Sequence, residues 1–140
     1  MSRFSKQEAI DFILSQSKIV WDLYSNVYNC QELPLIEIQS KSNRIAGTAY
    51  RSGKKVTFNL AFCMVEGEEF IRTIRHELAH IIQFRLFPSA PQAHGPEFRS
   101  ILESLGFDSS TYHKYDTLAA KSIAKKTKVL LIDSISVDEM

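Results

Sequence analysis

The apolar residues of the first thirty positions recur about every 3.6 residues, the period of a helix that buries one face. Ser5 followed by Glu8 forms the pattern of a capping box, in which each side chain satisfies a backbone group at the start of a helix. The sequence therefore predicts a helix that begins after Ser5 and ends before Pro34. Its apolar stripe consists of Ile10, Ile13, Leu14, Val20, Leu23, Tyr24 and Val27.

After Pro34 the apolar positions take on patterns typical of strands. Residues 35–39 alternate, residues 44–51 and 55–62 read as two further strands, and the Ser-Gly-Lys between these two predicts a hairpin turn. Two interpretations of residues 55–62 remain open. The segment is either a plain core strand or a strand at the edge of a cleft that pairs with an extended substrate.

Helical periodicity returns in the second half of the chain. A helix is predicted from about residue 68 to residue 86, with acidic residues in its first turn and Pro88 beyond its end. A second helix has Pro96 in its first turn and Gly106 as its stop. Residues 128–137 again look like a strand. These elements predict an α+β fold with a small β-sheet.

Composition and charge narrow the class of protein. The chain has 140 residues, 44% hydrophobic and 24% charged, which fits one domain with one core. A net charge of +1 excludes a global attraction to nucleic acid or to an anionic membrane. Cys30 and Cys63 form no CxxC pair and are expected to be reduced thiols. Without a signal peptide or a long apolar run, we expect a cytoplasmic monomer that does not contact membranes.

Three titratable residues interrupt the apolar run of the predicted helix 68–86. His76 and His80 are four positions apart, so both imidazoles lie on one face of a helix, with Glu77 beside them. Imidazoles that hold a zinc ion leave room for a water molecule, and a neighbouring carboxylate can take its proton. This is the HExxH pattern of zinc metallopeptidases. Two histidines at this spacing also occur by accident on surface helices, but the full pattern rarely does.

The sequence offers three candidates for a third ligand: His94, Glu97 and Glu103. His94 comes just before Gly95 and Pro96, where a sharp turn opens the next helix and would hold a ligand rigidly. Either glutamate, on that next helix, would instead give a site with two histidines and one carboxylate. From spacing alone all three remain open.

The HELAH motif at residues 76–80, followed by AHGPEF at residues 93–98, resembles the SprT-like metallopeptidases, the group that includes Spartan. The resemblance extends over residues 5–118, but only the two histidine motifs are specific. It implies a zincin-like domain in which His76, His80 and His94 bind zinc and Glu77 is the catalytic acid and base. The helix after the active helix would deliver His94.

One departure from the family concerns the end of the chain. Many SprT-like proteins continue into a cysteine-rich zinc ribbon, whereas this sequence has no cysteine after Cys63. We therefore expect one zinc ion per chain and a short form of the family. Residues 1–118 would form the metallopeptidase domain, and residues 119–140 a basic segment and strand packed on it.

Weaker candidates surround this motif. Tyr112, His113 or Tyr115 can donate a hydrogen bond to a developing oxyanion, although packing and surface solubility explain them equally well. Phosphate binding is possible for a second group of residues, which otherwise form an ordinary solvated surface. This group consists of Arg51, Lys54, Lys55, Lys121, Lys125, Lys126 and Lys128.

These observations predict a zinc-dependent peptidase that cleaves protein substrates. The resemblance to Spartan-type, DNA-dependent proteases adds DNA-bound or DNA-crosslinked proteins as targets, with weak and salt-sensitive binding of single-stranded DNA. Two alternatives remain. One is a zinc-stabilised module that binds protein or nucleic acid without cleaving, and the other is a peptidase that acts on one regulatory protein independently of DNA.

Overall fold

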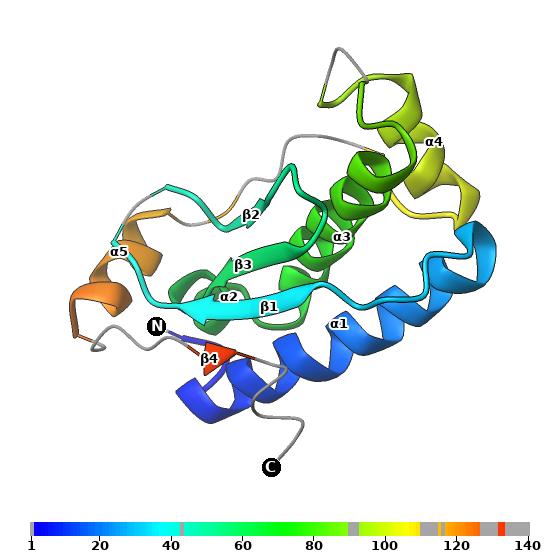
Figure 1. Cartoon of the computed structure of the whole chain (residues 1–140). Helices are drawn as coiled ribbons and strands as arrows, with labels where there is room; N and C mark the ends of the chain where they lie inside the picture. Colours follow the sequence, from blue (N-terminus) through cyan, green and yellow to red (C-terminus); the bar gives the residue numbers. More distant parts are fainter. Residues whose placement is uncertain are drawn as a thin grey trace.

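The computed structural model describes residues 2–42, 44–89, 93–109, 115, 117–126 and 132–133. It has the mixed α+β architecture expected from the sequence, with helices packed against one small sheet (Figure 1). The helices are α1 (Lys6–Tyr28), α2 (Leu60–Glu66), α3 (Ile71–Leu86), α4 (Pro96–Ser104) and α5 (Thr117–Lys126), and a 3₁₀ turn, η1 (Gly67–Phe70), leads into α3. The strands are β1 (Leu35–Gln39), β2 (Gly47–Ala49), β3 (Lys55–Asn59) and β4 (Ile132–Asp133).

Helix α1 begins as its capping box predicts. The Ser5 hydroxyl accepts a hydrogen bond from the Glu8 amide, and the Glu8 carboxylate accepts one from the Ser5 amide. Its buried face packs against α3 and α2. The helix ends at Asn29, whose backbone is left-handed with φ 56°. Asparagine tolerates this conformation better than most residues, because its short polar side chain bonds locally.

The sheet has the strand order β2-β3-β1-β4, with β1 parallel to β3 and the other pairs antiparallel. Alternate residues of β1 and β3 are buried on the face that carries the core. The hairpin between β2 and β3 confirms the predicted turn. Strand β3 is an interior strand, so the interpretation of residues 55–62 as a cleft edge is wrong. In the described part of the chain, β2 lies at one edge of the sheet.

Residues 60–62 also depart from the expected strand, because Asn59 ends β3 and caps α2. Its side-chain oxygen accepts a hydrogen bond from the Ala61 amide at 3.2 Å. Its side-chain nitrogen donates to the carbonyls of Lys41 and Ile45, which ties the loop between β1 and β2 to the same point. Asparagine is a favoured N-cap, and this signal was available in the sequence.

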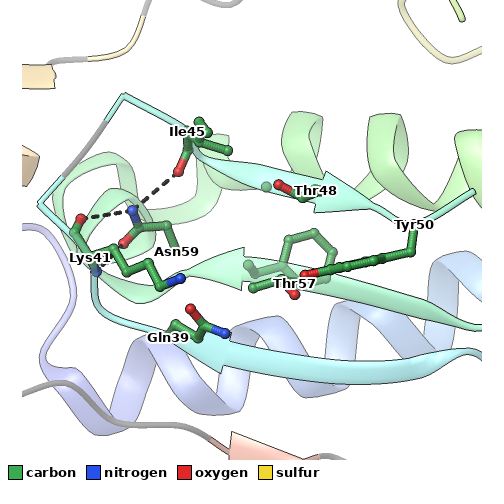
Figure 2. A pocket seen from close by; sticks show the side chains of 9 residues that line it. Gln39, Lys41, Ile45, Thr48, Tyr50, Thr57 and Asn59 are labelled. Carbon is green, nitrogen blue, oxygen red and sulfur yellow. Dashed lines mark hydrogen bonds between the residues drawn. The ribbon is translucent and has the colours of Figure 1, made fainter.

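The opposite face of the sheet carries a hollow of about 100 Å³ near the loop between β1 and β2. Figure 2 shows Thr48 and Tyr50 from the β2 side and Thr57 from β3 around it, with Gln39 and Lys41 on its far side. The helices lie behind the sheet in this view. Since β-strand side chains alternate between faces, Gly47 and Ala49 face the helices instead.

Gly53 gives a stability prediction for the β2–β3 turn. Its φ is +73°, and a β-carbon placed there would lie 2.9 Å from Cγ of Arg85. The Arg85 side chain has little freedom to move, because it donates to the carbonyls of Gly53 and Glu32. We expect Gly53→Ala to lower the free energy of unfolding in urea by about 2–3 kcal/mol, combining backbone strain with displacement of a hydrogen-bonded side chain.

Gly106→Ala is the matched control. Gly106 has the same positive φ of +73°, but a β-carbon there meets nothing within 4 Å. It should lower the unfolding free energy by about 1 kcal/mol, through backbone strain alone. Equal effects of the two substitutions would contradict the role given to Arg85.

Candidate metal centre

Helix α3 has one face that packs in the core and another that carries two histidines. Ile74, Leu78 and Ile81 are fully buried on its core side. His76 and His80, four residues apart, are also buried and lie one turn from each other on a different strip of the helix. Their Nε2 atoms are 3.2 Å apart.

Helix α4 brings the third histidine to this pair. Gly95 is the N-cap and Pro96 opens the helix, as the sequence predicts. The Nε2 atom of His94 lies 3.2 Å from that of His76. Phe98, in the first turn of α4, stacks on the His80 ring with centroids 4.1 Å apart and also contacts His76 and His94. The residues directly before α4 and its first turn therefore carry both a potential ligand and the phenylalanine ring that packs against the three histidines.

The three histidines form a donor set that fits a divalent metal ion. Their ligand atoms all lie within 4.8 Å of one another. Tetrahedral zinc with Zn–N bonds of 2.0–2.1 Å holds its nitrogens roughly 3.3 Å apart, close to the two separations of 3.2 Å. Among the described residues, Glu97 and Glu103 are not part of this group. Glu103 instead accepts a hydrogen bond from Ser109.

Gln83 orients one of these rings, a role that the sequence analysis missed. Its side-chain oxygen lies 2.9 Å from Nδ1 of His80. An amide oxygen only accepts hydrogen bonds, so Nδ1 carries the proton and Nε2 keeps its lone pair toward the other histidines. Burial lowers the pKa of His80 to about 4 and keeps the ring neutral, as a metal ligand must be. A glutamine three residues after His80 in a buried helix was the available signal.

We expect Gln83→Leu to weaken zinc binding by about 10- to 100-fold, the usual effect of removing an outer partner of a histidine ligand. Competition with a chromophoric chelator measures this change. Gln83→Glu is the matched control, because it keeps an acceptor oxygen and should bind zinc far more tightly than Gln83→Leu. Affinity of Gln83→Leu equal to that of the unmodified protein would contradict this orienting role.

The side chain of Glu77 extends from α3 toward the edge strand β2. Desolvation raises the pKa of its carboxyl to about 7, and a hydrogen bond from the Ala49 amide partly offsets this effect. A β-carbon on Gly47 would lie only 2.9 Å from Cγ of Glu77 and 3.0 Å from a methyl group of Thr73. The small residue thus lets β2 approach α3 closely enough for the Ala49 amide to bond the Glu77 carboxylate.

One side of the cluster is open. His94 is exposed, and a hollow of about 420 Å³ borders it along α4, lined by Gly95, Pro96 and Arg99 among others. Among the described residues, His94 is therefore the histidine that borders this hollow, while His76 and His80 are buried.

The weaker candidates fall at different places. The Tyr115 hydroxyl lies 2.7 Å from that of Thr73, one turn before Glu77, and its ring stacks on Phe70. Burial raises the pKa of Tyr115 to about 12. Its role as an oxyanion donor stays a prediction, and Tyr112 and His113 lie outside the described residues.

The basic residues do not form one surface. Arg51 and Lys54 lie in the β2–β3 turn, and Lys55 forms a 2.8 Å ion pair with Glu37. Lys121 belongs to α5, which packs on α2 at the other end of the sheet from that turn (Figure 1). The side chains of Lys125 and Lys126, and all of Lys128, lie outside the described part of the chain. A nucleic-acid role for these residues stays a prediction.

Comparison with known proteins identifies the family. The model of the SprT-like family matches residues 19–117, so the chain belongs to the SprT-like family. This is generally a zinc metallopeptidase-like family, which agrees with three histidines that can hold a metal ion. A comparison with solved structures found no significant match.

Several similar proteins carry the name Protein SprT. The one from Actinobacillus succinogenes is 32% identical over 84 residues, which is 59% of this chain and 47% of the relative. Those from Pseudomonas putida and Pseudomonas savastanoi pv. phaseolicola are 34% and 32% identical over 73 residues, which is 51% of this chain and 44% of each relative. The matched part thus spans about half the length of these relatives.

No helix in the described ranges combines the length and apolar character needed to cross a membrane.

Proposed function

We propose that this protein is a zinc-dependent endopeptidase with a zincin-like site. His76, His80 and His94 would hold one zinc ion, and Glu77 would be the catalytic acid and base. The convergence of three imidazole nitrogens within 4.8 Å, next to a carboxylate with a raised pKa, is the observation that carries the proposal. Family membership supports it.

The chemistry divides between the metal and the chain. When bound, zinc would acidify a water molecule and polarise the scissile carbonyl. Glu77 takes the proton of the attacking water and passes it to the leaving amine. The raised pKa of Glu77 suits both steps, because a carboxyl group that titrates near neutrality can accept a proton and then release it. The Ala49 amide keeps the carboxylate in place through the cycle.

The extent of the peptidase unit is part of the same proposal. Residues 1–118 would form the metallopeptidase domain, and residues 119–140 would pack on it. The packing of α5 on α2 and the pairing of β4 with β1 support the second part of this proposal, although the boundary after residue 118 falls inside α5.

For the substrate class we propose DNA-bound proteins, on the basis of the family resemblance. The test is cleavage of a protein–DNA conjugate with and without single-stranded DNA. Cleavage that DNA stimulates would support this substrate class, whereas cleavage indifferent to DNA would favour a peptidase that acts independently of DNA. One tightly held zinc without any cleavage would favour a binding module.

A further inference from the structure

The turn that follows β2 places a cation one aromatic ring away from the histidine cluster. Figure 2 shows Thr48 and Tyr50 on the sheet face turned away from the helices. Because strand residues alternate, Gly47 and Ala49 of β2 point toward α3. Strand β2 lies so close to α3 that a β-carbon on Gly47 would meet Glu77. The long side chain of Arg51, in the turn that follows the strand, reaches Phe84 of the same helix.

Arg51 contacts a row of stacked rings, Phe84, His80 and Phe98, which we call the aromatic ladder. One of these rings, His80, is a potential metal ligand. Its guanidinium lies 5.3 Å from the centroid of the Phe84 ring. The Phe84 ring stacks on His80 with centroids 5.6 Å apart and planes within 12°. Phe98 covers the other side of His80 at 4.1 Å. The positive charge of Arg51 thus sits one ring away from His80.

This cation has no acidic partner among the residues that the structure describes. The ion pairs found in these ranges involve other residues: Arg3, Lys18, Lys55 and Arg72. Arg51 is exposed, so its guanidinium can bind an anion that enters from solvent. An anion near the histidine cluster would also lower the repulsion between the guanidinium and a bound divalent cation. The planar guanidinium matches a carboxylate with two parallel hydrogen bonds.

We propose that Arg51 binds a carboxylate of the substrate next to the scissile bond, so that this peptidase selects acidic peptides. The inference deepens the proposed function and rests on it. Two sources offer this chemistry: the side chain of an aspartate or glutamate, and the free carboxylate at the end of a peptide chain. Arg51 is then a specificity-determining residue rather than one of the phosphate-binding group.

The test measures binding rather than turnover. The probes are alanine-based octapeptides with blocked ends that carry one glutamate at each position in turn, each beside its glutamine counterpart. They are titrated into zinc-loaded Glu77→Gln protein, which binds without cleaving. We expect at least one glutamate peptide to bind about five- to tenfold more tightly than its glutamine counterpart, a preference that weakens with added salt. Adding Arg51→Ala should remove the preference, and Arg51→Lys should keep only part of it.

Lys54→Ala is the matched control, since it removes a positive charge from the same exposed turn and should leave the preference intact. Repeating the titrations with a free C-terminal carboxylate separates the two sources. A gain that requires the free end identifies the chain terminus, and a gain in blocked peptides identifies the side chain. Equal affinity for all peptides, or a preference that survives Arg51→Ala, would overturn the proposal.

Two further outcomes distinguish failure of the carboxylate site at Arg51 from failure of the proposed peptidase activity. If the unmodified zinc-loaded protein cleaves none of the peptides and no unfolded protein, the proposed peptidase fails even where the carboxylate preference holds. If Arg51→Ala and Lys54→Ala weaken binding of a single-stranded oligonucleotide equally and leave peptide binding unchanged, phosphate recognition replaces the carboxylate site.

Discussion

Glu77→Gln is expected to lower kcat/KM for peptide hydrolysis by about 10²- to 10⁴-fold, the usual contribution of a general acid and base. Glutamine has the same shape, and its carbonyl can still accept the hydrogen bond of the Ala49 amide. It cannot take a proton from water. Because burial already favours the neutral form of the carboxyl, the amide should be tolerated in this position without loss of the fold.

The measurement compares initial rates of the two zinc-loaded proteins on an unfolded protein substrate. Zinc content and circular dichroism are the controls, and both should equal those of the unmodified protein. A variant that keeps one zinc and retains activity within a fewfold would show that Glu77 is not the base.

The second large effect is expected for His94→Ala, which removes one of three converging nitrogens. Zinc affinity should fall by more than the 10- to 100-fold that an outer partner contributes. At a zinc concentration of 1,000 times Kd, binding adds about 4 kcal/mol to the stability of the folded protein, which corresponds to roughly 10 °C in Tm for a domain of this size. The variant should lose this increase.

Glu97→Ala is the matched control for His94→Ala. It truncates a residue of the same helix that the sequence also offered as a ligand, and the structure leaves it out of the histidine group. It should keep the zinc-dependent rise in Tm. A rise that disappears in Glu97→Ala and persists in His94→Ala would assign the third ligand to the carboxylate instead.

The sequence predicted most of what depends on local pattern. The start of α1 follows from Ser5 and Glu8, and the pairing of His76 with His80 follows from helical geometry. The approach of His94 was expected only through the family resemblance. Spacing left Glu97 and Glu103 equally open, because it does not say how α4 packs on α3.

Contacts between distant segments were not predictable in this way. The aromatic ladder from Phe98 through His80 and Phe84 to Arg51 joins a hairpin turn to two helices. The close approach of Gly47 to Glu77 depends on the strand order, which no periodicity encodes. The change from β3 to α2 at Asn59 was missed because the apolar residues that follow it suit a buried helix as well as a strand.

The most direct test of zinc-dependent proteolysis is a cleavage time course with one unfolded protein substrate and three forms of this protein: zinc-loaded, stripped by a chelator, and reloaded with one equivalent of zinc. We expect cleavage by the first form, none by the second, and recovery in the third. Cleavage that continues after zinc is removed, or reloaded protein that holds one zinc and cleaves nothing, would contradict the account.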